Sequence, residues 1–142
     1  MSAEHFLDTN ILICLFDETA PEKRQTATLL VERSLAGGSG CISWQVVQEA
    51  LNVMTRKLCA TPEDAQRFLD EVMQPLWRIY PSASLYRGAL DLQSRYRFSL
   101  YDSLIVASAL EARCTTLFSE DLQHGQSIAS LTILDPFRGN EP

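Results

Sequence analysis

The chain has 142 residues, of which 46% are hydrophobic and 21% charged, a composition that fits one globular domain and excludes a disordered protein. Its formal net charge of −6 argues against broad nucleic-acid binding through a basic surface. No apolar run approaches the roughly 20 residues that span a bilayer, so we expect no membrane segment. We expect a single domain over residues 1–142, with 138–142 as a loose tail.

Cysteine usage indicates the compartment. The four cysteines, at positions 14, 41, 59 and 114, are far apart and form no Cys-x-x-Cys pair. With only two histidines in the chain, this spacing argues against a zinc site. Scattered cysteines in apolar surroundings are typical of reduced core residues, whereas a disulfide pair is the less favoured alternative. The sequence therefore predicts a cytoplasmic protein.

Short apolar runs alternate with longer stretches of helical periodicity. The runs that predict strands are residues 5–7, 41–43, 76–80, 115–118 and 131–134. The stretches that predict helices are 21–35, 44–57, a helix starting at 61–62, 84–97 and 100–113. This alternation implies crossover connections and a parallel sheet covered by helices on both faces. Because ligands bind beyond the carboxyl ends of such strands, residues directly after the runs are the site candidates.

Four acidic residues occupy such positions or the helices next to them. Asp8 ends the first run, and Asp121 follows the fourth. Asp102 begins the helix that leads into the fourth run, and Glu49 lies in the helix after the second. Asp8 is enclosed by apolar residues on both sides, and burying an unpaired charge is costly. Its carboxylate must therefore be solvated, paired, or bound to a cation.

Each acid also has a purely structural interpretation. Asp8 could cap the next helix, and Asp102 stands three residues after Ser99 in a variant of the capping box. Asp121 could close a turn, and Glu49 could lie on a solvated helix face. Taken singly, the structural interpretation is favoured for every acid except Asp8.

Taken together, acids at one edge of a sheet repel one another. Two like charges ~4 Å apart cost about 4 kcal/mol at an effective dielectric constant of about 20. Such a cluster persists only if protons or a divalent cation offset the repulsion. Oxygen ligands without His or Cys favour Mg²⁺ or Mn²⁺, which can activate water for phosphodiester hydrolysis.

Four motifs resemble those of PIN-domain ribonucleases and, within that family, of the VapC toxins of bacterial toxin–antitoxin pairs. The motifs are FLDTNIL at 6–12, SWQVVQE at 43–49, YDSLIVASA at 101–109 and LFSEDLQHG at 117–125. The ending ILDPF at 133–137 also resembles a family ending. The resemblance covers nearly the whole chain, in order and at compatible spacing.

The resemblance implies a PIN-like, three-layer α/β/α fold with a five-stranded, mainly parallel sheet in the order 3-2-1-4-5. It implies that the catalytic and metal-binding acids are Asp8, Glu49, Asp102 and Asp121. Chemistry and resemblance together make Asp8 and Asp102 the expected direct ligands. The other two acids would bind through water, hold a second metal, or orient the attacking water.

The same resemblance assigns supporting polar residues. Asn10 and Ser119 match positions where family members place such groups, although a plain helix cap is an equally good interpretation of Asn10. Many members have Thr where this chain has Ser119. Glu120 adds an acid beside Asp121 and could compete with it for the metal.

The leading hypothesis is a Mg²⁺- or Mn²⁺-dependent endoribonuclease, the toxin of a type II toxin–antitoxin module. By resemblance, its partners would be RNA, a cognate antitoxin and a second copy of the chain. One alternative is a haloacid-dehalogenase-like phosphohydrolase with Asp8 as nucleophile, but such enzymes need an Asp where this chain has Asn10. The other is a PIN-like module that binds RNA or protein without cleavage, against which the presence of all four acids counts.

Overall fold

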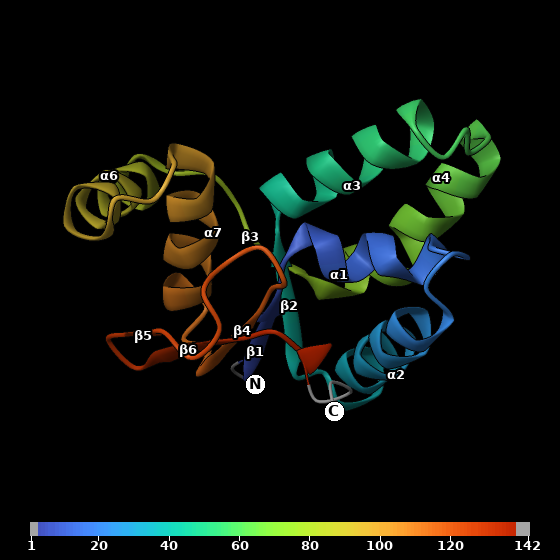
Figure 1. The fold of residues 1–142 in the computed structure, drawn as a ribbon. Coiled ribbons are helices and arrows are strands. Elements are labelled where there is room, and N and C mark those ends of the chain that lie inside the picture. The colour runs from blue at the N-terminus through green and yellow to red at the C-terminus, as the bar shows by residue number, and fades with distance from the viewer. Residues whose placement is uncertain (1–2, 139–142) are drawn as a thin grey trace.

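A six-stranded sheet forms the centre of the computed structural model, which describes residues 3–138 (Figure 1). In spatial order the strands are β3 (Trp77–Ile79), β2 (Gly40–Ser43), β1 (His5–Leu7), β4 (Thr116–Phe118), β6 (Leu131–Leu134) and β5 (Ser127–Ile128). Neighbouring strands run parallel from β3 to β6, and β5 alone pairs antiparallel, with β6. The carboxyl ends of the parallel strands therefore share one edge of the sheet.

Helices cover both faces of this sheet. They are α1 (Thr9–Ile13), α2 (Pro21–Gly37), α3 (Trp44–Arg56), α4 (Pro62–Phe68), α5 (Gln74–Leu76), α6 (Ala83–Tyr96) and α7 (Leu100–Glu111). A 3₁₀ turn, Cys14–Phe16, follows α1, and a π-helical stretch, Leu69–Met73, joins α4 to α5. Figure 1 shows α6 and α7 on one side of the sheet and α1, α2 and α4 on the other.

The predicted α/β/α class is confirmed, and the five predicted strands all form in the predicted order. The strand count is a correction, because β5 adds a sixth strand at the β6 edge. Two residues are too few to show an alternating pattern, so the sequence carried no strand signal there. The predicted helix ends differ from the observed ones by one or two residues, as helix boundaries commonly do.

Side-chain caps start the helices that flank the site. The Thr61 and Ser99 hydroxyls accept hydrogen bonds from the backbone N–H groups of Asp64 and Asp102, each at 3.1 Å. Both predicted helix starts are therefore confirmed. Because Ser99 caps α7, it fixes the first turn in which Asp102 lies.

The core lies on both sides of β1, whose Phe6 and Leu7 are wholly buried. Residues of β2, β4 and β6 and of the helices above and below complete it. All four cysteines are free, and three of them are buried as expected. Cys59 is a correction: it is exposed and has a positive φ of 53° in the turn after α3.

Helix α2 approaches the sheet closely at Gly40. A Cβ at this position would lie 2.4 Å from the Cβ of the wholly buried Ser34. Gly40→Ala is therefore expected to destabilise the protein by about 1–3 kcal/mol, measured by urea unfolding. Gly88→Ala is the control, because no atom lies within 4 Å of a Cβ there and helix α6 should gain about 0.5–1 kcal/mol. Equal stability of the two variants would contradict this packing.

Two expectations concern the chain's ends and surroundings. No helix among residues 3–138 is both long and apolar enough to cross a membrane. Of the tail predicted at 138–142, only Arg138 lies within the described residues, and its backbone N–H donates to the Asp135 carbonyl at 3.4 Å. The remainder of that prediction falls outside them.

Candidate metal centre

Asp8 stands where β1 ends and α1 begins. Its side chain caps α1 by accepting a 2.7 Å hydrogen bond at Oδ1 from the Thr9 N–H, while its own N–H donates to the Phe118 carbonyl of β4. The residue is only 7% exposed. The structural and the functional interpretations of Asp8 are therefore compatible, because the same carboxylate is both a cap and a buried charge.

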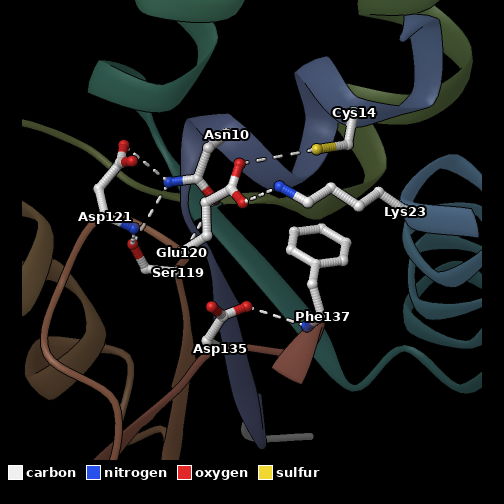
Figure 2. Close-up of polar contacts among 8 residues, drawn as sticks. All are labelled: Asn10, Cys14, Lys23, Ser119, Glu120, Asp121, Asp135 and Phe137. Carbon is white, nitrogen blue, oxygen red and sulfur yellow. Dashed lines mark hydrogen bonds and ion pairs between the residues drawn. The ribbon is translucent and has the colours of Figure 1, made fainter. Parts of the chain in front are cut away.

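A polar network joins Asp8 to Asp121. The Ser119 hydroxyl donates to Asp8 Oδ2 at 2.8 Å. The Asn10 amide nitrogen lies 3.1 Å from Asp121 Oδ2, 3.3 Å from Ser119 Oγ and 3.4 Å from Asp8 Oδ2. Figure 2 shows Asn10 directed at Asp121 and Ser119. The structure thus brings together four of the predicted site residues, contributed by the β1–α1 junction and by the segment after β4.

Glu49 joins this group through a residue that sequence reasoning missed. The Thr9 hydroxyl donates to Glu49 Oε1 at 2.8 Å, so α3 is tied to the start of α1. Glu49 is half-buried, and its charge contributes to the raised pKa of Asp8. The only signal for Thr9 in the sequence is that a hydroxyl residue directly follows Asp8.

Asp102 lies in the first turn of α7 and is half-buried. The neighbouring Tyr101 carbonyl accepts a 3.1 Å hydrogen bond from the buried Gln45 side chain, which ties α7 to α3. Among residues 3–138, no side chain forms a hydrogen bond or ion pair with the Asp102 carboxylate. This acid is held in place by its backbone, and its carboxylate remains available to a ligand.

The four predicted acids carry negative charge without an ion-pair partner among residues 3–138. The pKa of Asp8 is raised from 3.8 to about 6, and burial is the largest cause. Hydrogen bonds from Ser119 and Thr9 act in the opposite direction, and the charges of Glu49 and Asp121 contribute to the rise. Within the described residues, no lysine or arginine forms an ion pair with any of the four predicted acids.

Glu120 does not compete with Asp121 in this structure. Its carboxylate is directed toward Lys23, whose Nζ lies 2.7 Å from Oε2, while Asp121 is directed toward Asn10 (Figure 2). The Glu120 backbone N–H nevertheless donates to Asn10 Oδ1 at 3.2 Å. Glu120 therefore supports the site through its backbone and directs its charge elsewhere.

The donor set fits Mg²⁺ or Mn²⁺ in one particular manner. Within residues 3–138, no three His, Cys, Asp or Glu side chains converge closely enough to hold a metal by themselves. Mg²⁺ does not require such a cage, because it usually keeps several waters and binds through one or two carboxylates. The buried Asp8 carboxylate, which has no ion-pair partner among residues 3–138, fits a direct ligand of this kind.

The comparisons with known proteins agree with this fold. The PIN-domain family model matches residues 5–126. A toxin–antitoxin complex from Klebsiella pneumoniae has a similar structure (TM-score 0.69, 21% identity, 94% of this chain and 98% of that chain covered). So does VapC20 from Mycobacterium tuberculosis, a sarcin–ricin loop cleaving toxin (TM-score 0.60, 18% identity, 83% and 92% covered). FitAcB from Neisseria gonorrhoeae is a third (TM-score 0.62, 17% identity, 94% and 98% covered).

No curated protein matches the sequence significantly. At 17–21% identity the similar structures show a shared fold, whereas the family match extends over most of the chain and includes all four predicted acids. The PIN-domain resemblance of the sequence is therefore confirmed, and the chain belongs to the PIN-domain family.

Proposed function

We propose that this protein is a Mg²⁺- or Mn²⁺-dependent endoribonuclease and the toxin of a type II toxin–antitoxin module. The observation that carries the proposal is the buried Asp8 carboxylate, which lies near further acids and has no ion-pair partner among residues 3–138. Membership of the PIN-domain family supports nuclease chemistry. The similar structures, which include a toxin–antitoxin complex and a sarcin–ricin loop cleaving toxin, support the toxin role.

The chain's own residues divide the work of phosphodiester hydrolysis. When bound, a divalent cation would neutralise charge on the scissile phosphate and favour ionisation of a water. Asp8 and Asp102 would hold it directly, with Asp8 oriented by the Thr9 N–H and the Ser119 hydroxyl. This orientation matters because a displaced ligand costs binding and rate.

The second carboxylate oxygens of Glu49 and Asp121 are suited to proton transfer. Glu49 Oε1 is used by Thr9 and Asp121 Oδ2 by Asn10. Glu49 Oε2 and Asp121 Oδ1 remain able to accept a hydrogen bond from an attacking water and then its proton. Either residue can therefore act as the base.

A groove beside the site supports an antitoxin partner. It encloses about 930 Å³ between the 3₁₀ turn after α1, the end of α3, and α4. Apolar side chains such as Phe16 and Phe68 line it, and acidic side chains outnumber its single arginine. The acids are Asp17, Glu18, Asp64, Glu71 and Glu120. Such a surface suits an amphipathic segment with basic side chains, which an acidic toxin would attract.

A second copy of the chain is the other proposed partner. Helices α6 and α7 carry exposed large apolar side chains, among them Tyr86, Leu90, Leu100 and Tyr101. Exposed apolar surface of this kind favours association. The free cysteines are consistent with the reducing cytoplasm as the place of action.

The phosphohydrolase alternative is weakened by Asn10. An enzyme with Asp8 as nucleophile would need a proton donor two residues further on. The Asn10 amide occupies that position and contacts carboxylates, but an amide N–H is too weak an acid to transfer its proton to a leaving group.

Purified protein incubated with a mixed RNA pool tests the proposal. We expect cleavage in Mn²⁺ or Mg²⁺ and none with excess EDTA, because the acids alone cannot stabilise charge on the phosphate. Equal cleavage in EDTA would contradict metal dependence. Release of phosphate from a monoester without RNA cleavage would favour the phosphohydrolase, and RNA binding without either reaction would favour a non-catalytic module.

The toxin role has its own test. A small reading frame directly upstream of this gene is expected, and its product should co-purify with the protein and suppress the cleavage. If the protein cleaves RNA but has neither such a neighbouring gene nor such an inhibitor, it is a ribonuclease outside a toxin–antitoxin module, and the toxin role is contradicted.

A further inference from the structure

We infer that Lys23 is a positioning residue of the candidate metal centre: by pairing with Glu120, it holds residues 119–121 so that Asp121 faces Asp8 and Glu120 does not. The inference rests on the proposed function, because it assigns Lys23 a role in that same site. Figure 2 shows the contacts that carry it.

An ion pair between Lys23 and Glu120 joins α2 to the segment after β4. Lys23 Nζ, from the first turn of α2, lies 2.7 Å from Glu120 Oε2, and the two side chains are 45% and 26% exposed. The other carboxylate oxygen, Oε1, accepts a 4.0 Å contact from the buried Cys14 thiol. Both oxygens of Glu120 are therefore engaged on the side of α1 and α2, away from Asp121.

Lys23 is held in place by an aromatic ring as well as by Glu120. Its ammonium lies 5.3 Å from the centroid of the Phe137 ring, within the range of a cation–π interaction. Phe137 is buried, and its N–H donates to Asp135 Oδ1 at 2.9 Å, so the ring is fixed just after β6. Lys23 is thereby restrained by the segments that follow two different strands, β4 and β6.

Asn10 connects the Lys23–Glu120 ion pair to Asp8 and Asp121. The Glu120 N–H donates to Asn10 Oδ1, which leaves the Asn10 amide nitrogen to face Asp121 Oδ2 and Asp8 Oδ2. The reversed amide would place its oxygen against two carboxylates and would be repelled. The position of the 119–121 backbone therefore sets the orientation of Asn10, and Asn10 in turn sets the spacing of the two acids.

The loss of Lys23 would affect both Glu120 and the position of Asp121. The Glu120 carboxylate is mostly covered, so without its cation it would be a poorly solvated charge close to an acidic site. Moving the 119–121 segment outward relieves that charge but separates Asp121 from Asp8. Positioning and long-range electrostatics then predict opposite results: displaced ligands weaken cation binding, whereas an added negative charge near the site strengthens it.

The test is the affinity of the full-length protein for Mn²⁺, measured by isothermal titration calorimetry. Lys23→Glu is expected to weaken binding about 10-fold, the usual effect of losing a group that orients ligands. Arg24→Glu makes the same charge change one position along α2, at an exposed residue that has no ion pair within the described chain, and should bind Mn²⁺ at least as tightly as wild type. Lys23→Glu binding as tightly as Arg24→Glu would overturn the inference.

Two further variants separate a positioning effect from damage to the fold. The exchanged pair Lys23→Glu/Glu120→Lys restores the contact and is expected to recover to within about 3-fold of wild type, because directly paired residues are not additive. If Lys23→Glu does not fold, Lys23→Met keeps the aliphatic stem over Phe137 and should show an intermediate loss. Failure of the exchange to recover binding in a folded protein would count against the inference.

A metal-free readout keeps this inference separate from the proposed function. The NMR signals of the Asn10 side-chain amide should shift in Lys23→Glu, return in the exchanged pair, and stay unchanged in Arg24→Glu. Unchanged signals in Lys23→Glu would overturn the inference. Wild-type protein that neither binds Mn²⁺ nor cleaves RNA would instead overturn the proposed function, whatever the amide signals show.

Discussion

Asp8→Asn is expected to lower metal-dependent RNA cleavage at least about 100-fold while the protein stays folded. Asparagine has nearly the same shape and caps helices as well as aspartate. Its one side-chain oxygen can still accept the hydrogen bond from the Thr9 N–H, while the amide nitrogen that replaces Oδ2 can donate to the Ser119 hydroxyl oxygen. What it loses is the negative charge at the centre of the acidic site. The loss should therefore appear in the cleavage rate and in Mn²⁺ affinity, measured on the same preparation.

Asp91→Asn is the matched control for this experiment. It makes the same chemical change at an exposed carboxylate on α6, where Asp91 pairs with Arg95 at 3.2 Å. Exposed pairs of this kind contribute little, so both cleavage and stability should stay close to wild type. Wild-type rates of cleavage in Asp8→Asn would remove Asp8 from the mechanism.

The second large effect concerns the stability of the metal-free protein. The pKa of Asp8 is about 6 in the folded protein and 3.8 in the unfolded chain, so this carboxyl group binds its proton more tightly in the folded state. The associated stability is fully present below about pH 4 and is lost as the pH rises through about 6, a change of about 3 kcal/mol. Metal-free wild type is thus expected to be less stable than Asp8→Asn at pH 8, but not at pH 4.

Urea unfolding in EDTA from pH 4 to pH 8 measures this difference. The comparison with Asp8→Asn cancels other titrations, including that of His5, whose pKa is lowered by burial and whose contribution to stability rises with pH. Adding Mn²⁺ at pH 8 should stabilise wild type and leave Asp8→Asn unchanged. A stability difference that is constant across this pH range would show that Asp8 is not buried as a raised-pKa acid.

Much of the fold could be predicted because its elements are locally encoded. Buried strands such as β1 and β6 are apolar runs, and α4 and α7 begin at hydroxyl caps that the sequence displays. The sixth strand, Ser127–Ile128, exists only because β6 offers an unpaired edge. The π-helical stretch at Leu69–Met73 likewise depends on packing, since its apolar residues have ordinary helical spacing.

The site was predictable as a set of acids but not as a network. Asp8 stood out because a charge interrupts an apolar run, and the resemblance supplied Glu49, Asp102 and Asp121. The Thr9–Glu49 hydrogen bond and the Lys23–Glu120 pair join residues 40 and 97 positions apart, and no local pattern reports such contacts. For the same reason, the choice between Asp121 and Glu120 needed the direction of each side chain.

Anomalous diffraction from a crystal soaked in Mn²⁺ tests whether a divalent cation binds at the Asp8 carboxylate. We expect an anomalous peak about 2.0–2.3 Å from an Asp8 oxygen, with Glu49, Asp102 and Asp121 contacting the ion directly or through water. An Asp8→Asn crystal soaked in the same way should show no peak at this position. A fully soaked wild-type crystal with no peak at Asp8, or with a peak held by other residues, would contradict cation binding at Asp8.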